Sequence, residues 1–391
     1  MSNRLVRLLF LLCASVPFFN FVPFVPLNMD SRERTFLALD HQQPDRVPID
    51  FWSTSGFDAK LQSTLSLTRQ QWLDAHDVDL RYIPGPSYVG PELRPLAGDL
   101  AQDVFGVGRR KIAVPTDDGQ ETYSEVAHSP LADAETVEQI NDYDHWPSPD
   151  WFDYSGIEAQ CDTIRNANRV VVFMGDRLNR VAQLKPAMYL RGVEQIFMGL
   201  VLNPEIAKAI FNKIRNFYLD YTERIFTAAN GKIDILLTGD DFGSQNGPLV
   251  SPAMWTEFFG RGFAYYIDLA HSFGLKVMHH TCGSVVPIIP LMIERGLDIL
   301  QSLQPEAAGM EPAGLKRRFG DKLCFQGGIS IQSTLPLGQP ADVEKQVQQT
   351  IDALAPGGGY ILGTAHNLQA DVPIANAQAL MAAYHRYAPY A

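Results

Sequence analysis

Residues 279–283, HHTCG, are the strongest candidates for metal chemistry in this sequence. Side chains alternate along a strand, so His280 and Cys282 project from one face while His279 points the other way. An imidazole and a thiolate two residues apart on one face can both reach a zinc ion, at about 2.0–2.3 Å. A lone His-x-Cys pair is a weak pattern, however, and ordinary packing is the alternative interpretation.

A catalytic zinc site needs a third protein ligand and an open coordination position. His366 is the first candidate for that ligand, and Asp240 or Asp241 is the second. Adjacent strand residues point to opposite faces, so only one aspartate can face the cavity, as a metal ligand, an acid/base group or a partner for arginine. The other would cap the following loop. Cys324 is a weaker candidate, because a small buried apolar role suits it better.

Apolar runs rich in β-branched residues precede these side chains and predict the strands that position them. Their nearly continuous hydrophobicity is typical of strands buried on both faces of a parallel sheet. Eight such runs, with helical patterns between most of them, favour an α/β fold of the (β/α)8 TIM barrel type over an open sheet. The runs cover residues 47–52, 78–83, 170–175, 233–238, 276–280, 298–303, 323–326 and 359–363.

Three of the intervening helices have clear signals. Two are predicted to begin with a polar cap followed by a first-turn proline, one from 203 to about 231 and one from 251 to about 274. An apolar stripe over 343–354 predicts a third. The long segment 84–168 breaks the alternation. Its turn-rich part around Gly106, Gly108 and 117–119 predicts a hairpin followed by loops, which we interpret as a long insertion after the second strand on the active-site side.

In a barrel of this kind, chemistry takes place at the carboxyl ends of the strands. Polar residues recur at those positions, and the recurrence is a stronger signal than any single motif. Trp52, Phe57, Tyr88 and Tyr189 could line a pocket, with Trp52 and Tyr189 as candidates to bind a flat cofactor, although core packing is the default for aromatic residues. The polar strand-end residues are Asp50, Asp176, Arg177, Asp240, Asp241, His280, Cys282, Gln304, Glu306, Gln326, His366 and Asn367.

The overall composition is that of an ordinary globular protein. The 391 residues are 46% apolar and 19% charged, which excludes disordered, collagen-like and coiled-coil classes. The net charge of −12 argues against a nucleic-acid partner, since neutralising phosphates requires clustered Lys and Arg. Four cysteines in so long a chain do not make a disulfide framework. A homodimer is the expectation from the frequency of such assemblies.

Residues 1–28 form an apolar N-terminal extension unlike the rest of the chain. One interpretation is a signal peptide or membrane anchor. Three prolines within the extension would break a spanning helix, however, so stable membrane insertion is not expected. The other interpretation is that translation starts at Met29. We therefore expect one domain over residues 29–391 and a cytoplasmic location.

Six blocks of the sequence, in order from about Met29 to Tyr387, resemble the uroporphyrinogen decarboxylase superfamily. The resemblance implies the same (β/α)8 barrel. The blocks are RERTFLALDHQQPDRVPIDFW, LRGVEQIFMGLVLNPE, GDDFGSQNGPLVSPAMWTEFF, HHTCGSVVPIIPLMIERGLDIL, GMEPAGLKRRFGDKLCFQGGIS and GGGYILGTAHNLQADVP.

The superfamily contains two chemistries, and the sequence matches them unequally. True decarboxylases carry an arginine-rich N-terminal motif that grips the carboxylates of the substrate. The matching stretch here, IDFWSTSGFDAKL, has no arginine, whereas an octa-carboxylate needs several cationic partners. The cobalamin-dependent methyltransferases carry His-x-Cys after the fifth strand, which His280 and Cys282 match. Their late cysteine is absent, and His366 stands near its place.

The methyltransferase resemblance implies zinc acting as a Lewis acid on the methyl acceptor. It also implies a corrinoid, which a separate protein would carry because this chain has no D-x-H-x-x-G motif. In this first hypothesis His280, Cys282 and His366 hold the metal. Asp240 or Asp241 is an acid/base or supporting group, and Gln326 orients a small-molecule substrate.

Two other hypotheses remain open. One is a carboxy-lyase of the uroporphyrinogen decarboxylase type in porphyrin biosynthesis, with Asp50 stabilising a protonated pyrrole and no metal. The other is a non-catalytic protein that binds a tetrapyrrole or a small acid. Retention of ligand without turnover would favour the latter.

Overall fold

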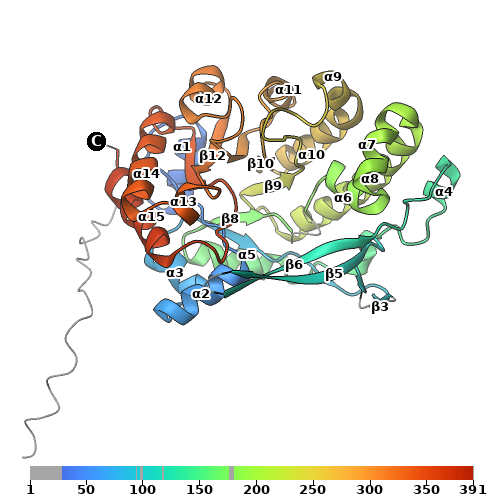
Figure 1. Cartoon of the computed structure of the whole chain (residues 1–391), viewed down its shortest axis with the longest axis horizontal. Coiled ribbons are helices and arrows are strands. Elements are labelled where there is room, and N and C mark those ends of the chain that lie inside the picture. Colours follow the sequence, from blue (N-terminus) through green and yellow to red (C-terminus); the bar gives the residue numbers. More distant parts are fainter. Residues whose placement is uncertain (1–28, 94, 97–99, 117–118, 176–179, 391) are drawn as a thin grey trace, which may run out of the picture.

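The structure is a computed structural model that describes residues 29–93, 95–96, 100–116, 119–175 and 180–390. Within these residues seven parallel strands form one sheet in the order β1-β8-β9-β10-β11-β12-β13, which curls into a TIM-barrel-like half barrel (Figure 1). The strands are β1 (Leu80–Ile83), β8 (Val170–Phe173), β9 (Ile235–Gly239), β10 (Lys276–His280), β11 (Ile299–Leu303), β12 (Cys324–Ile329) and β13 (Tyr360–Thr364).

The segment predicted as the first strand, 47–52, is extended but is not a strand of this sheet. It makes an isolated bridge between Ile49 and Leu362 of β13, and the Asp50 N–H donates to the Leu362 carbonyl at 2.9 Å. On its other side the Ile49 carbonyl accepts the Asp79 N–H at 3.0 Å, next to β1. Pro48 has no N–H to donate, which limits the ladder. The segment therefore hydrogen-bonds to both edges of the sheet without continuous pairing.

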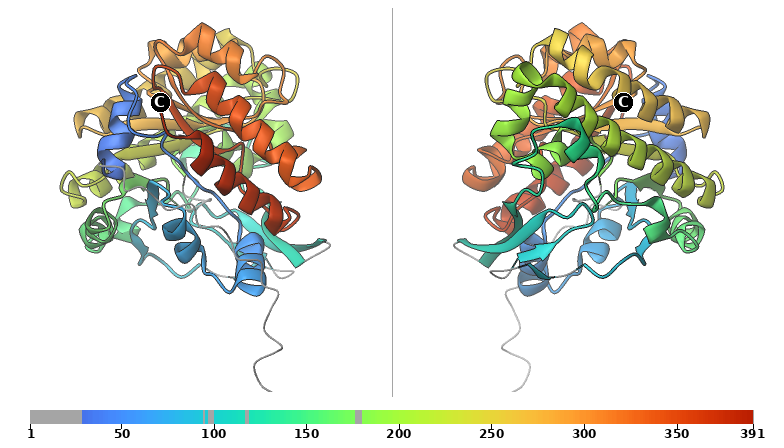
Figure 2. Two further views of the ribbon diagram at one scale, coloured as in Figure 1. Left: turned by 90° about the vertical axis from the view of Figure 1, so that its left-hand side faces the viewer. Right: turned by 90° about the vertical axis from the view of Figure 1, so that its right-hand side faces the viewer.

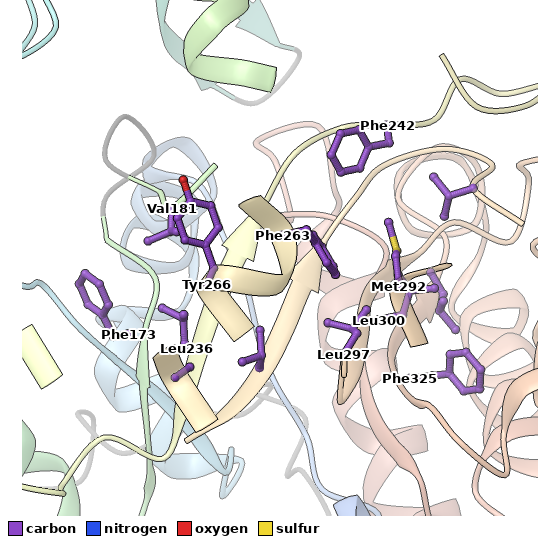
Figure 3. Close-up of a cluster of buried hydrophobic side chains, with 14 of the residues drawn as sticks. Phe173, Val181, Leu236, Phe242, Phe263, Tyr266, Met292, Leu297, Leu300 and Phe325 are labelled. Atoms are coloured by element: carbon purple, nitrogen blue, oxygen red, sulfur yellow. The ribbon is translucent and has the colours of Figure 1, made fainter. Parts of the chain in front are cut away.

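Strand alternation divides the interior into two parts. Every second residue points into the curled sheet, where Leu80, Val172, Leu237 and Met278 belong to one buried apolar cluster. The intervening residues belong to a second, larger cluster that packs against the helices. Figure 3 shows part of that outer core, in which Phe173, Leu236, Leu300 and Phe325 of the strands lie among Phe263, Tyr266 and Met292 of the helices.

Helices follow most of the strands and cover the outer face of the sheet. Figure 2 shows α14 and α15 side by side on one flank. Within the described residues, no helix is long and apolar enough to cross a membrane. The helices are α1 (Ser31–Leu39), α2 (Ser55–Leu65), α3 (Arg69–Ala75), α4 (Val137–Asn141), α5 (Ile157–Asn166), α6 (Leu184–Arg191), α7 (Val193–Leu202), α8 (Pro204–Ala228), α9 (Pro252–Trp255), α10 (Arg261–Ser272), α11 (Ile289–Glu294), α12 (Pro312–Phe319), α13 (Thr334–Leu337), α14 (Pro340–Leu354) and α15 (Ile374–Tyr387).

The three helices predicted from cap and stripe signals are confirmed as α8, α9 with α10, and α14. The Ser251 hydroxyl accepts the Met254 N–H at 3.2 Å, as the cap signal predicts. A π-helical turn, Thr256–Gly260, joins α9 to α10. Asn203 differs from the expectation, because its side chain makes no capping hydrogen bond with any described residue.

The segment between β1 and β8 is more regular than predicted. The expected hairpin is present as β5 (Gly108–Thr116) and β6 (Gly119–His128), paired antiparallel. It extends a small sheet with β3 (Pro95–Leu96) and β4 (Leu100–Gln102), and β2 (Ser87–Tyr88) pairs with β7 (Phe152–Asp153). The expectation of loops after the hairpin is wrong at α5. Buried Ile157 and Cys161 sit four residues apart, which is too short an apolar stripe for a clear sequence signal.

Buried carboxylates hold the amino ends of the strands in a repeated arrangement. Asp79, Asp234 and Asp298 each precede a strand and accept a backbone N–H from the neighbouring strand segment at 2.8 Å. Asp79 is fully buried and also accepts from the guanidinium groups of Arg34 at 2.8 Å and Arg46 at 2.7 Å. This end of the sheet is thus fixed by charge pairs that are shielded from water.

Removing the Asp79 carboxylate should therefore be costly. We expect Asp79→Ala to lower the free energy of unfolding by about 3–5 kcal/mol, because two buried guanidinium groups each lose their fully buried carboxylate partner and keep only a partly exposed one. Asp220→Ala is the control, since it removes an exposed i,i+4 pair with Arg224 and should cost under about 1 kcal/mol. Urea unfolding of both variants measures the difference. If both variants lost the same free energy of unfolding, the buried charge pairs of Asp79 would not be what stabilises this end of the sheet.

Candidate metal centre

Three of the predicted metal ligands converge at the carboxyl ends of the strands. One ligand atom each from His280, Cys282 and His366 lies within 4.8 Å of the other two, and the group could hold a metal ion. His280 is the last residue of β10, Cys282 follows it by two residues, and His366 follows β13 by two. The Cys282 Sγ lies 3.4 Å from the His280 Nε2. A nitrogen and sulfur donor set of this kind suits zinc.

A hydrogen bond from the neighbouring strand fixes the orientation of the His280 ring. Its Nδ1 lies 2.6 Å from the amide oxygen of Gln301, which stands opposite His280 in the β10–β11 register. An amide oxygen only accepts, so Nδ1 carries the proton and Nε2 keeps its lone pair on the side of Cys282. Burial lowers the pKa of His280. The neutral tautomer that binds metal is therefore the one this site favours.

His279 lies on the opposite face, as strand alternation predicts. Its Nδ1 is 2.8 Å from the Thr238 hydroxyl, and its ring stacks on Phe242 and packs edge-on against Phe263. Burial lowers its pKa to about 3. His279 is thus a neutral core residue on the helix side of the sheet.

The two adjacent aspartates have different surroundings. The Asp240 carboxylate accepts the backbone N–H groups of Gln183 and Lys185, both at 2.7 Å, at the first turn of α6. Burial raises its pKa to about 6. Asp241 instead faces the cluster, with Oδ1 at 3.5 Å from the His280 Nε2 and at 3.2 Å from the Cys282 N–H.

Asp241 is ionised beside the candidate ligands. Its carboxylate also pairs with the Lys185 ammonium. Burial alone would raise the pKa of Asp241, but the neighbouring Lys185 ammonium acts against burial and keeps that pKa below its usual range. The pKa of the Cys282 thiol is shifted upward instead. Burial, reinforced by the Asp241 charge, raises its pKa to about 12.

Cys324 does not take part in this cluster. It is buried among the inward-facing apolar residues, and its thiol donates to the Leu39 carbonyl at 3.3 Å. Gln304 and Glu306 support loops: Gln304 accepts the Gly283 N–H, and Glu306 accepts from the Ser330 hydroxyl. Asp176 and Arg177 lie outside the described residues.

Trp52 joins the candidate ligands to a second polar group inside the barrel. Its indole stacks on the His280 ring at 5.8 Å between centroids and donates to the Tyr82 hydroxyl at 2.7 Å. That hydroxyl donates in turn to Asp50 at 2.6 Å, and the Gln326 amide donates to the same carboxylate oxygen at 3.2 Å. Burial raises the pKa of Asp50 to about 6, although the Tyr82 bond opposes the rise.

A pocket opens beside the cluster, with an empty volume of about 460 Å³ that includes open solvent. Tyr189 is one wall, and the Arg109 guanidinium lies over the Tyr189 ring, 4.5 Å from the ring centroid. Its lining residues are Arg180, Ala182, Lys185, Pro186, Tyr189, Gly239, His280, His366 and Asn367.

Two glycines allow the strand-end loops to cross. A Cβ on Gly243 would lie 2.6 Å from the Cys282 carbonyl, and a Cβ on Gly283 would lie 2.6 Å from the Gly243 backbone. Gly283 also has a positive φ of 77°, which favours glycine. The loop carrying Cys282 can therefore lie against the loop after Asp241 only because neither residue has a side chain.

Sequence reasoning missed three residues around this centre, namely Gln301, Lys185 and Tyr82. Gln301 and Tyr82 are inward positions of predicted strands, so alternation could have found them. Lys185 lies on a helix, and nothing in the sequence connects it with Asp241.

Comparison with known proteins places this geometry in a family. The uroporphyrinogen decarboxylase (URO-D) family matches residues 124–387, which is more than half of the chain. The chain belongs to the URO-D family. The match includes all three candidate ligands and both aspartates after β9.

Among individual URO-D relatives the similarity is partial. The uroporphyrinogen decarboxylase of Sodalis glossinidius is 38% identical over 74 residues, covering 19% of this chain and 20% of the relative. That of Yersinia pseudotuberculosis is 28% identical over 132 residues, covering 29% and 36%. The matched regions thus span about a third or less of the length of these relatives.

A solved structure shares the fold over almost its whole length. A methyltransferase from Methanosarcina mazei superposes with a TM-score of 0.64 at 15% identity, covering 92% of this chain and 99% of that one. At this identity the likeness concerns the fold alone. It agrees with a TIM-barrel-like arrangement for this URO-D family member.

Metal affinity should depend on pH through the Cys282 thiol. Because its pKa is raised to about 12, the thiol is protonated at neutral pH, and a metal must displace the proton to bind sulfur. We expect the Kd for Co²⁺ to fall by up to about tenfold for each pH unit between pH 6.5 and 8.5. Competition with a chelator measures it. Cys282→Ala should weaken binding and flatten this dependence, and a flat profile in the wild type would contradict thiolate ligation.

Proposed function

We propose that the protein is a zinc-dependent methyltransferase in which His280, Cys282 and His366 hold the metal. The observation that carries the proposal is the convergence of these three side chains at the carboxyl ends of the strands. Three protein ligands with nitrogen and sulfur donors leave one position open, as catalytic zinc sites require. The donor set therefore fits zinc, and the fixed tautomer of His280 supports the fit.

Zinc bound there would supply a Lewis acid that lowers the pKa of a thiol or similar methyl acceptor. The chain's own residues would prepare the site for that acceptor. Gln301 holds the His280 ring, and Asp241 accepts the Cys282 N–H while balancing positive charge. With its pKa held so low, Asp241 is a poor proton acceptor at neutral pH, so a supporting role suits it better than general base catalysis.

Asp240 also acts by support in this proposal. Its carboxylate holds the first turn of α6, the helix that contributes Lys185 and Tyr189 to the pocket. Gln326 is the candidate to orient a small substrate, since its amide oxygen is buried and has no hydrogen-bond partner among the described residues. Tyr189 lines the pocket, whereas Trp52 is buried and stacks on the His280 ring.

The methyl donor in the proposal is a corrinoid carried by a separate protein. The acceptor sulfur would form a bond to the methyl carbon as the cobalt–carbon bond breaks. The corrinoid would supply the methyl group and keep the electron pair of the bond that breaks, as cobalt(III) becomes cobalt(I), and the thiol proton of the acceptor would go to solvent. The methyltransferase with the same fold supports methyl transfer by analogy. The proposal also includes a complete (β/α)8 barrel with residues 84–168 as an insertion on the active-site side.

Decarboxylation is the second candidate because of the surroundings of Asp50. A carboxyl group inside the barrel with its pKa raised to about 6 could stabilise a protonated pyrrole. Two relatives with partial similarity carry the name uroporphyrinogen decarboxylase. The absence of arginine from the stretch 49–61 weighs against an octa-carboxylate substrate.

Metal content tests the first proposal directly. Elemental mass spectrometry of the full chain should find about one zinc ion per chain, lost in His280→Ala and in Cys282→Ala and reduced in His366→Ala. Cys324→Ala is the matched control, because that thiol lies among apolar side chains away from the cluster, and it should keep its zinc. A folded wild type that contains no zinc, even after incubation with the ion, would sink the proposal.

Turnover separates the two candidate functions. Zinc-loaded protein, methylcobalamin and a small thiol should together give the absorbance of cob(I)alamin under anaerobic conditions, and His280→Ala should abolish the change. Release of CO₂ from uroporphyrinogen, lost in Asp50→Asn and insensitive to zinc removal, would support the second candidate instead.

A further inference from the structure

Two loops at the carboxyl ends of the strands are paired with each other. One follows β13 and carries His366, and the other begins at Trp52, the last residue of the extended segment 47–52. The Leu368 N–H donates to the Trp52 carbonyl and the Thr54 N–H donates to the Leu368 carbonyl, both at 2.9 Å. The loops therefore hold one another, and any group that fixes them also fixes the position of His366.

The β5–β6 hairpin places a buried carboxylate against both loops. Glu121 of β6 is only 3% exposed, and its Oε2 accepts the Thr54 hydroxyl at 2.7 Å and the Ala370 N–H at 3.1 Å. Thr54 is also the N-cap of α2, so the carboxylate stands at a helix N-terminus that favours negative charge. A charge so well buried is costly unless it has such partners.

The hairpin fits closely where Glu121 enters. A Cβ on Gly56 would lie 2.7 Å from Glu121 Oε2 and 2.8 Å from the Gln120 carbonyl, so a side chain there would displace the strand. Further along β6, the Tyr123 hydroxyl donates to Gln369 at 3.3 Å. Figure 1 shows the hairpin running from beside α2 past the edge of the curled sheet.

We propose that Glu121 is a positioning residue for the metal centre. This inference rests on the proposed function, because it assigns to the hairpin the task of holding the third ligand. The carboxylate touches neither the cluster nor the pocket lining. It acts by fixing Ala370, four residues after His366, to Thr54, two residues after Trp52. Without it, the Ala370 N–H loses its acceptor and the Thr54 hydroxyl keeps only the Leu368 carbonyl, at 3.2 Å, so the loop carrying His366 is held less firmly.

Cobalt binding to the full chain provides the test, since Co²⁺ reports on its ligands by its visible spectrum. We expect Glu121→Ala to weaken Co²⁺ binding by on the order of 10–100-fold, the range found when groups that orient metal ligands are removed. Its spectrum should approach that of His366→Ala. Glu121→Gln should remain near wild type, because the amide oxygen can still accept both hydrogen bonds.

Glu125→Ala is the control, because Glu125 is an exposed carboxylate on the same strand. It should leave affinity and spectrum unchanged. Melting temperatures of all variants separate loss of folding from loss of the ligand. If Glu121→Ala does not fold, Glu121→Asp replaces it, since the shortened side chain withdraws the carboxylate by one methylene and should also weaken binding.

The outcomes distinguish this inference from the proposed function. Wild-type protein that binds Co²⁺, together with a folded Glu121→Ala or Glu121→Asp variant of unchanged affinity and spectrum, overturns the role of Glu121 alone. A wild type that binds no metal overturns the proposed function and this inference with it.

Discussion

The hydrogen bond between His280 Nδ1 and Gln301 decides what the centre of this protein can do. It leaves Nε2 with a lone pair on the side where Cys282 and His366 lie. The bond exists because β10 and β11 are parallel neighbours with these two residues in register and both directed inward. A slip of one residue would replace His280 by His279 on the inner face. The apolar residues that fix the register, such as Met278 opposite Ile299, therefore also fix the chemistry.

The two ends of the sheet use polar groups in opposite ways. At the amino ends, carboxylates such as Asp79 and Asp234 have several partners each and hold strand to strand. At the carboxyl ends, the Gln301 Nε2 and the Gln326 Oε1 are buried without a partner among the described residues. Unmet hydrogen-bonding capacity costs stability. Two such amide groups on the strands that lead to the candidate ligands agree with a functional face at the carboxyl ends in barrels of this class.

Strand positions and the inward direction of His280 and Cys282 were predictable, because both follow from hydrophobic runs and a period of two. The direct contacts between distant segments were not. Gln301 had a sequence signal only as an inward residue, and the link between Glu121 and Ala370 joins residues 249 positions apart. The choice between Asp240 and Asp241 needed the position of α6, whose first turn binds Asp240. The hydrophobic pattern wrongly predicted a strand over 47–52, because Pro48 has no N–H to pair with a neighbouring strand. It also missed α5, because the apolar stripe of that helix is short and stands among polar residues.

Trp52 links the two chemistries that this fold could support. Its ring stacks on His280, and its N–H begins the chain through Tyr82 to Asp50. A carboxyl group with a raised pKa thus lies close to a candidate metal ligand. The positions of these groups are compatible with both decarboxylation and metal-assisted methyl transfer. The charged and metal-binding groups available to each reaction distinguish the two. A poly-carboxylate would need several cationic partners around Asp50. The stretch 49–61 has no arginine, and the ammonium of its one lysine, Lys60, donates to the Ala370 and Val372 carbonyls. The three nitrogen and sulfur groups that could hold a metal ion, by contrast, all come from this chain. That difference in available partners is the physical reason to favour metal-assisted methyl transfer over decarboxylation.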